Sequence, residues 1–157
     1  MNLDQDLASL QEVRNLLHAA TKAQKIYGQF SQEKINEVCQ AIADAGVANS
    51  ERLAKMAQQE TGFGIWQDKV IKNIFASKTV NDRYKDMKTV GIVGEHPEKK
   101  TIDIAVPVGV VAGIIPSTNP TSSIFYKSLV ALKGGNAIVF SPHPGAKNCI
   151  LEAVKVV

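Results

Sequence analysis

Two short apolar runs, Val108-Gly-Val-Val-Ala-Gly-Ile-Ile115 and Asn136-Ala-Ile-Val-Phe140, decide the fold. Each has the length and β-branched content of a strand that is buried on both faces of a sheet. Residues 121–133 lie between them and carry apolar side chains at helical spacing, and the pattern from Ala146 onward is helical again. A strand, a crossover helix and a second apolar strand form a right-handed βαβ unit. The sequence therefore predicts an α/β fold with the first βαβα portion of a parallel sheet.

Residues 1–88 show the three- and four-residue apolar spacing of amphipathic helices. The face of the first helix is expected to be formed by Leu3, Leu7, Leu10, Val13, Leu17 and Ala20, and Tyr27-Gly28 interrupts it. Three further helices are expected, with Ser31 and Ser50 as N-caps, Gly46 and Gly62 as stops, and the last helix running from Val70 toward Tyr84.

Residues 89–94 and 101–107 are short, β-branched and partly alternating, and the charged residues 95–100 separate them. This pattern predicts a β-hairpin. The chain thus divides into a helical part over 1–88, a hairpin arm over 89–107 and the start of a parallel sheet over 108–157. Because sheets usually have more than two strands, we expect these residues to be the N-terminal part of a larger α/β protein.

Composition excludes several classes. The chain has 157 residues, of which 45% are hydrophobic and two are Cys, so a disulfide scaffold is excluded. No apolar run is long enough to span a bilayer, and the acidic N-terminus has no secretory pattern, so we expect a cytoplasmic protein. The net charge of +3 comes from dispersed lysines without interleaved aromatics, which does not indicate nucleic-acid binding. No His, Cys and Asp cluster has the spacing of metal ligands.

Three segments carry a specific resemblance: Glu60–Asn73, Pro107–Ser122 and Lys127–Pro144. In order and spacing they resemble the CoA-acylating branch of the aldehyde dehydrogenase superfamily. The resemblance implies an incomplete Rossmann-like coenzyme domain, NAD as the cofactor and coenzyme A as the cosubstrate. It also implies that the hairpin at 89–107 is an arm through which subunits form a homo-oligomer.

The family reaction converts an aldehyde, NAD⁺ and CoA to acyl-CoA and NADH, with acetaldehyde as the expected substrate. In the family a Cys thiolate attacks the aldehyde, hydride passes to the nicotinamide, and CoA takes the acyl group. That Cys is expected to lie beyond residue 157, so residues 1–157 alone are expected to be inactive. Some relatives reside in protein-shelled bacterial microcompartments, so a location inside such a compartment stays open for this protein.

Cofactor-binding residues follow from the resemblance at the ends of the two strands. They are Ile114, Ile115, Pro116 and Ser117 after the first strand, and Ser141, His143 and Pro144 after the second. Ligands of open α/β sheets bind outside the carboxyl ends of strands, which supports this assignment physically. Non-acylating relatives carry a Lys at the position of Ser141, so the ribose contact of that Lys does not transfer directly. His143 is equally compatible with an ordinary surface loop.

Thr118 and Asn119 are the catalytic candidates. The superfamily has an Asn in this loop whose amide donates to the oxyanion of the thiohemiacetal. Ungapped counting places Thr118 at that position, whereas the acylating branch commonly carries Thr-Asn-Pro, so either residue could donate. Cys39 and Cys149 lie on apolar helical faces and are interpreted as buried hydrophobic residues rather than nucleophiles.

Two other functions stay open. One is a non-catalytic assembly fragment that uses the hairpin and the first helix as interaction surfaces. The other is a non-acylating aldehyde dehydrogenase, which Thr118-Asn119-Pro120 and Ser141 disfavour.

Overall fold

The computed structural model describes residues 4–157, so Leu3 of the expected first helical face lies outside the described residues. The helices are α1 (Gln5–Tyr27), α2 (Gln32–Ala48), α3 (Ser50–Thr61), α4 (Trp66–Ile74), α5 (Val80–Tyr84), α6 (Pro120–Lys133) and α7 (Lys147–Val156). A π-helical turn (Phe75–Thr79) joins α4 to α5, and a 3₁₀ turn (Pro144–Ala146) precedes α7. The strands are β1 (Gly91–His96), β2 (Thr101–Ala105), β3 (Val110–Ile115) and β4 (Ala137–Pro142).

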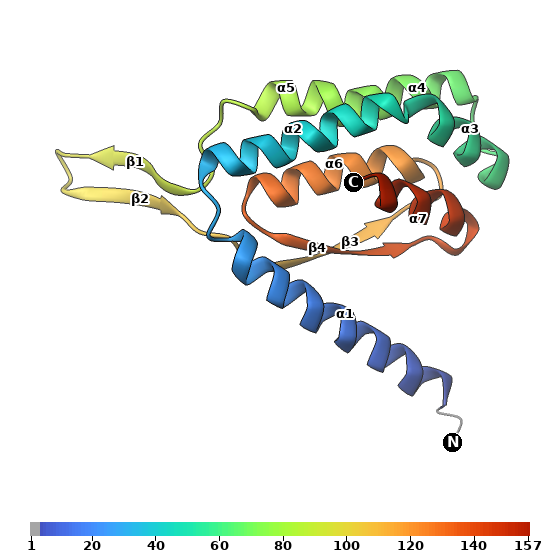
Figure 1. The fold of residues 1–157 in the computed structure, drawn as a ribbon, viewed down its shortest axis with the longest axis horizontal. Helices are drawn as coiled ribbons and strands as arrows, with labels where there is room; N and C mark the ends of the chain where they lie inside the picture. The colour runs from blue at the N-terminus through green and yellow to red at the C-terminus, as the bar shows by residue number, and fades with distance from the viewer. Residues whose placement is uncertain (1–3) are drawn as a thin grey trace.

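The predicted βαβ unit is confirmed. Strands β3 and β4 are parallel neighbours, and α6 crosses between them. One face of this small sheet packs against α6, and α2, α3 and α4 pack on α6 in turn (Figure 1). The core between these layers includes Ile35, Leu53, Phe125 and Ile150, each at most 1% exposed. The architecture is a partial α/β domain of Rossmann-like type.

The expectation that the strands are buried on both faces is wrong. Ile115 is 1% exposed, but its neighbour Ile114 is 73% exposed. Alternate residues of a strand point to opposite faces, so one face of β3 is covered by α6 while Ile114 points away from it. The strand also begins at Val110 rather than Val108, because Gly109 has a φ of 114° that an extended strand does not allow.

The predicted helix boundaries are partly confirmed. Ser31 caps α2 by accepting from the Lys34 N–H, and Gly62 ends α3 with a left-handed φ of 69°. Ser50 is not an N-cap, because Asn49 occupies that position and Ser50 is the first helical residue. Gly46 does not end α2, which continues to Ala48.

Gly46 instead lies where α2 approaches the π-helical turn. A Cβ added at Gly46 would lie 2.5 Å from the Cβ of Ser77, so no side chain fits between the two helices. The Ser77 hydroxyl donates to the Asn73 carbonyl oxygen at 2.7 Å, within the same helical run. The single helix predicted from Val70 toward Tyr84 is therefore continuous but contains one wider turn.

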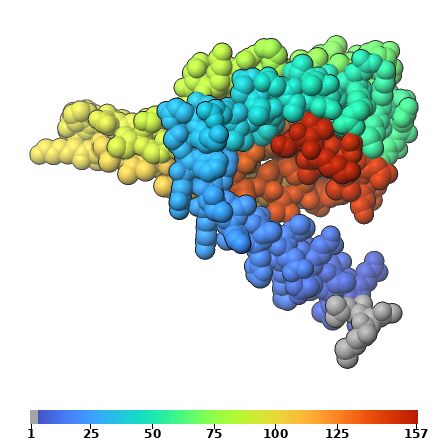
Figure 2. Space-filling model, viewed as in Figure 1, coloured from blue at the N-terminus to red at the C-terminus, as the bar shows by residue number. Residues whose placement is uncertain are grey.

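The hairpin projects away from the packed helices, and Figures 1 and 2 show it as a separate arm. Strands β1 and β2 pair antiparallel, with an irregularity between Ile92 and Gly94. Ile92, Ile102 and Ile104 are 41–57% exposed, so the ribbon presents apolar side chains to its surroundings. Figure 1 also shows α1 leaving the body on the opposite side of the strands from α6.

The turn between α6 and β4, residues 132–136, connects several distant segments. Side chains from α1 and from the root of the hairpin donate to its carbonyl groups, and its Asn136 side chain accepts from the backbone before β3. The hydrogen bonds are Gln24 Nε2 to Gly135 O (3.2 Å), Tyr27 Oη to Leu132 O (3.1 Å), Thr89 Oγ1 to Lys133 O, and Gly109 N to Asn136 Oδ1 (3.0 Å). Burial raises the pKa of Tyr27, which keeps its phenol protonated as a donor.

Among the described residues, no helix combines the length and apolar character required to cross a bilayer.

Candidate functional site

The carboxyl ends of β3 and β4 bring the two predicted cofactor segments together. Ile114 is paired with Ser141 and Ile115 with Pro142 in the parallel ladder. The His143 N–H donates to the Ile115 carbonyl oxygen at 3.1 Å, which continues the ladder one step beyond the strands. Loops 116–119 and 143–145 therefore leave the sheet side by side.

The predicted cofactor residues differ in accessibility. Ile114, Pro116, Ser141, His143 and Pro144 are exposed at this edge, and Ser117 is half-buried. Ile115 packs into the core with 1% exposure, so only its backbone faces the loops. Their roles in binding a cofactor stay predictions.

His143 has a structural role in its own loop. Its Nδ1 accepts a hydrogen bond of 3.0 Å from the Gly145 N–H and so caps the 3₁₀ turn. The neutral ring then carries its proton on Nε2, because the accepting nitrogen is unprotonated. The exposed ring could present that nitrogen to a ligand at the strand ends.

The two helices that follow the strands begin differently. The N-terminus of α7 is occupied by Glu60 of α3, whose carboxylate accepts from the Asn148 N–H at 2.8 Å and the Cys149 N–H at 2.7 Å. Burial opposes ionisation of Glu60, but these two hydrogen bonds outweigh it and lower its pKa. At the start of α6, by contrast, the Asn119 side chain makes no capping hydrogen bond. An anion would therefore meet a carboxylate at α7. At α6, Pro120 has no N–H and the Ser123 N–H donates to Asn119 O, so the N–H groups of Thr121 and Ser122 are the ones that an anion could reach.

Thr118 and Asn119 lie immediately before α6, and α4 holds them in place. The Lys69 ammonium donates to the Thr118 carbonyl oxygen at 3.1 Å, and the Lys72 ammonium donates to Asn119 Oδ1 at 3.1 Å. Burial first, and then the charge of Lys72, lowers the pKa of Lys69.

Asn73 completes the connection between α4 and α6. Its side chain is fully buried, donates to the Ser50 carbonyl oxygen at 2.9 Å and accepts from Thr121 Oγ1 at 2.9 Å. It thereby joins the first turns of α3 and α6 through one amide. Buried polar groups are costly without partners, so this amide fixes the relative position of the three helices.

A groove of about 390 Å³ runs beside Asn119 between α4 and α6. Its lining is mainly apolar, with an amide, an ammonium and two hydroxyl groups near the start of α6. The lining residues are Ile71, Lys72, Phe75, Ala76, Asn119, Ser122, Ser123 and Tyr126. A small organic molecule with one polar group suits this combination of a mostly apolar wall and a few convergent polar atoms.

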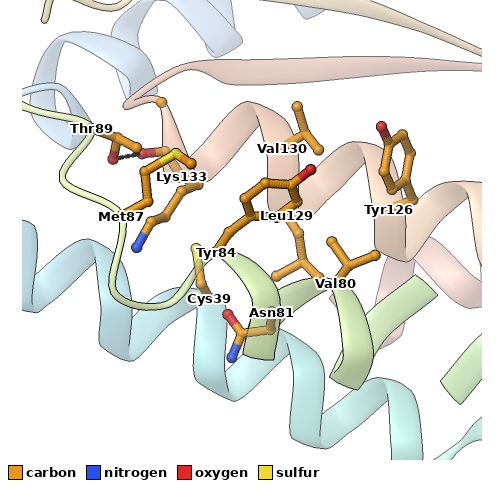
Figure 3. Close-up of a pocket in the computed structure, with 11 residues that line it drawn as sticks. Cys39, Val80, Asn81, Tyr84, Met87, Thr89, Tyr126, Leu129, Val130 and Lys133 are labelled. Carbon is orange, nitrogen blue, oxygen red and sulfur yellow. Dashed lines mark hydrogen bonds between the residues drawn. The ribbon is translucent and has the colours of Figure 1, made fainter. Parts of the chain in front are cut away.

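A second cavity of about 270 Å³ lies near the root of the hairpin, between α5 and α6 (Figure 3). Figure 3 shows Tyr84, Met87, Leu129 and Val130 around it, with Thr89 hydrogen-bonded to Lys133. The Lys133 ammonium donates to Asn36 Oδ1 at 2.6 Å and to the Lys85 carbonyl oxygen at 2.9 Å, so its donors hold the fold together. None of the predicted site residues lines this cavity.

The interpretation of the two cysteines as core residues is confirmed. Cys39 is 1% exposed and Cys149 is fully buried, with Cys149 Sγ donating to the Ala146 carbonyl oxygen at 3.3 Å. Burial, followed by the nearby Glu60 carboxylate, raises the pKa of Cys149 to about 12. A thiol that stays protonated near neutral pH is a poor nucleophile. Within residues 4–157, no group of three or more His, Cys, Asp or Glu side chains is arranged to hold a metal ion.

Four residues at this site were missed by the sequence reasoning: Glu60, Lys69, Lys72 and Asn73. The last three stand at positions i, i+3 and i+4 of one short helix, between the apolar residues Val70, Ile71 and Ile74. That spacing was a usable signal, since it places three polar groups on one face. A helix face that is only exposed to solvent gives the same pattern. The packed structure is needed to distinguish such a face from one that contacts a loop.

The fold and the paired strand-end loops define an α/β domain suited to a nucleotide ligand. The model of the family described as "Aldehyde dehydrogenase family" matches residues 4–157, and the chain belongs to this family.

Comparison with individual proteins of this family identifies several similar sequences and structures. The chain is 45% identical over 151 residues to the bifunctional aldehyde-alcohol dehydrogenase AdhE of Escherichia coli (strain K12), covering 96% of this chain and 17% of that protein. A probable aldehyde dehydrogenase from Listeria monocytogenes EGD-e superposes with a TM-score of 0.95 at 60% identity, covering 98% of this chain and 34% of that one.

Two further solved structures are similar. An acetylating aldehyde dehydrogenase from Geobacillus thermoglucosidasius has a TM-score of 0.95 and 50% identity, covering 99% of this chain and 34% of that one. A propionaldehyde dehydrogenase from Rhodopseudomonas palustris with bound propionyl-CoA has a TM-score of 0.71 and 33% identity, covering 89% and 31%. The chain thus spans 17% to 34% of the lengths of these four proteins.

Proposed function

We propose that this chain forms the N-terminal part of the coenzyme domain of an NAD-dependent, CoA-acylating aldehyde dehydrogenase. The whole enzyme converts an aldehyde, NAD⁺ and CoA to acyl-CoA, NADH and a proton, with acetaldehyde as the expected substrate. The observation that supports this most directly is the adjacency of the two strand-end loops, in which Ile114 pairs with Ser141. The acetylating relative and the relative that binds propionyl-CoA support the use of CoA.

The residues at the strand ends fit a nucleotide cofactor. Exposed side chains of Ser141 and His143 offer a hydroxyl and a ring nitrogen on one loop. The other loop leads to the uncapped N-terminus of α6, where N–H groups can meet a negatively charged group. NAD⁺ supplies the hydride acceptor when it is bound. The carboxylate of Glu60 keeps cofactor phosphates away from the start of α7.

The catalytic contribution of these residues is stabilisation of negative charge on the aldehyde oxygen. Asn119 lies at the groove and Thr118 precedes it, so an amide N–H or a hydroxyl is available there. Because Cys39 and Cys149 are buried with raised pKa values, the nucleophilic cysteine is proposed to lie outside residues 1–157.

The hairpin is proposed to mediate a homo-oligomer. Strands β1 and β2 pair with each other, and the arm carries exposed isoleucines on both strands. A two-stranded ribbon is marginally stable by itself, so packing against a second copy would stabilise it. Substituting Ile102 and Ile104 by Thr should shift the full-length protein to a smaller species in sedimentation equilibrium, while an unchanged mass would contradict this role of the arm.

The activity is tested with the full polypeptide that the gene encodes. NADH formation from acetaldehyde and NAD⁺ should require CoA and should be accompanied by acetyl-CoA, and NADP⁺ should replace NAD⁺ poorly. Equal NADH formation without CoA, with acetate as the product, would identify a non-acylating enzyme instead. Absence of NADH formation under both conditions would overturn the proposal.

The location of the nucleophile is tested with residues 1–157 alone. No acyl-CoA should form, because both cysteines in this chain are buried. Acyl-CoA formation that disappears on substitution of Cys149 by Ala would contradict the placement of the nucleophile elsewhere.

A further inference from the structure

Helix α4 holds the first turn of α6 and the loop before it through three side chains on one face. Lys69 donates to the Thr118 carbonyl oxygen, Lys72 donates to Asn119 Oδ1, and Asn73 accepts from Thr121 Oγ1. The three contacts are spread over four consecutive residues of the chain, from 118 to 121. A loop held at several successive points has little freedom to reorient its side chains.

The contact of Lys69 fixes the backbone of this loop. Lys69 is only 6% exposed, and its ammonium lies 3.1 Å from the Thr118 carbonyl oxygen. Because the peptide unit is planar, fixing this carbonyl also fixes the plane that leads to Asn119. Loss of the Thr118 carbonyl contact would leave the buried Lys69 ammonium without this acceptor. Breaking the contact therefore costs free energy.

The contact of Lys72 determines the orientation of the Asn119 amide. An ammonium carries only donors, so the atom 3.1 Å from it must be the acceptor Oδ1. The NH₂ group is then on the other side of the amide. Its contact within the described chain is a 3.5 Å approach to Thr118 Oγ1, which is at the limit of a hydrogen bond. At least one amide hydrogen is therefore available to a ligand.

The same geometry distinguishes Asn119 from Thr118. Asn119 lines the groove between α4 and α6, whereas Thr118 does not. In its approach to the Asn119 NH₂ group, the Thr118 hydroxyl is on the accepting side. The Thr118 hydroxyl keeps its own O–H donor. The difference is that Asn119 has a free donor at the groove, whereas Thr118 is outside the groove lining.

We propose that Lys72 is a positioning residue that orients the Asn119 amide, and that Asn119 rather than Thr118 donates to the aldehyde oxygen. The inference rests on the proposed function. When a thiolate adds to the carbonyl carbon, a C–S bond forms and the π electron pair moves to oxygen. The Nδ2–H of Asn119 stabilises this oxyanion, and the positive charge of Lys72 on Oδ1 makes the amide a stronger donor.

The experiment measures kcat and KM of the full-length enzyme and its variants with acetaldehyde. Asn119→Ala should lower kcat by about 10²- to 10³-fold, as loss of an oxyanion donor does elsewhere. Lys72→Met should lower kcat roughly tenfold with little change in KM, because it loosens a group used mainly in the transition state. Lys72→Arg keeps a cationic donor and should restore most of the rate. Thr118→Val should stay within about threefold of the wild type.

A double variant separates positioning from a general structural effect. If Lys72 acts through Asn119, adding Lys72→Met to Asn119→Ala should cause little further loss. The matched control is Lys78→Met, which removes an exposed lysine paired with Asp82 on the following turn. This control should leave both kinetic constants unchanged.

The outcomes separate the two proposals. An inactive wild-type enzyme would contradict the proposed function itself. An active wild type whose kcat is unaffected by Lys72→Met, or is lost in Thr118→Val but kept in Asn119→Ala, would overturn the inference alone. Lys72 is exposed, so its variants should unfold at the wild-type urea midpoint, and multiplicative losses in the double variant would also count against positioning.

Discussion

Thr121 Oγ1, in the first turn of α6, donates a 2.9 Å hydrogen bond to Asn73 Oδ1 of α4, and both side chains are at most 2% exposed. This contact joins residues 48 positions apart in the sequence. It holds the helix that carries the two lysines against the helix that begins beside Asn119. The stability of the fold and the geometry of the candidate site therefore depend on the same buried amide.

Substitution of Asn73 should be strongly destabilising. Asn73→Ala leaves the Ser50 carbonyl and the Thr121 hydroxyl without their partner and creates a small cavity. We expect a loss of about 2–4 kcal/mol in the free energy of unfolding, measured by urea denaturation. Thr121→Val, which removes one of the two hydrogen bonds, should cost less. Equal stability of Asn73→Ala and the wild type would contradict the role of this amide.

Glu60 should make the stability of the chain depend on pH. Its folded-state pKa is lowered, so its contribution is present above the ordinary glutamate pKa and is lost as the pH falls through the lowered value. Glu60→Gln should cost about 1 kcal/mol near neutral pH, because an anion at the α7 N-terminus is replaced by a neutral amide. The difference in urea midpoint between the two proteins should shrink as the pH is lowered below the ordinary glutamate pKa and through the lowered value. A constant difference across this range would argue against the charge as the cause.

Gly46 should not tolerate alanine, although alanine favours helices. In an open helix Gly→Ala stabilises by up to about 1 kcal/mol. Here the new Cβ would meet Ser77 Cβ at 2.5 Å and Phe125 Cδ1 at 3.2 Å. We therefore expect a lower thermal unfolding midpoint. The double variant Gly46→Ala with Ser77→Gly removes the closest contact and should recover part of the loss, whereas a raised midpoint in the single variant would contradict this close packing.

Filling the groove should change substrate preference. Ser122 lines it near Asn119, so Ser122→Met would occupy part of its roughly 390 Å³ volume. We expect KM to rise more for butyraldehyde than for acetaldehyde in the full-length enzyme, since the longer chain needs more of the groove. The exposed Ser9→Met change on α1, outside the groove and the strand-end loops, serves as the control for aldehyde selectivity. An equal effect of Ser122→Met on both aldehydes would show that the chain of the substrate lies elsewhere.

Local signals in the sequence predicted much of the architecture. The cap at Ser31, the left-handed Gly62 and the crossover from β3 to β4 follow from residue chemistry and periodicity, which do not require knowledge of distant neighbours. The π-helical turn was not predictable, because it occurs where Gly46 lets α2 approach Ser77. The burial of the strands was overestimated because burial depends on which distant elements cover each face of the sheet, and local sequence does not show this.

The candidate site was likewise predictable only in part. The resemblance to a family supplied Asn119 and the strand-end residues, and the parallel register of β3 and β4 explains why they lie at one edge. Lys69 and Lys72 carry no local sequence mark that separates a loop-binding lysine from a solvated one. Their partners lie 49 and 47 positions away in the sequence, so only tertiary packing reveals them.

The turn at residues 132–136 couples the local unfolding of three parts of the chain. Side chains from α1 and the hairpin root, together with the backbone before β3, all hydrogen-bond to this one short segment. Losing the turn would release all three at once, so these parts should behave as a single cooperative unit. In hydrogen–deuterium exchange, the amides of Gly135 and Asn136 should exchange as slowly as the most protected amides of α6, although they lie in a connecting turn.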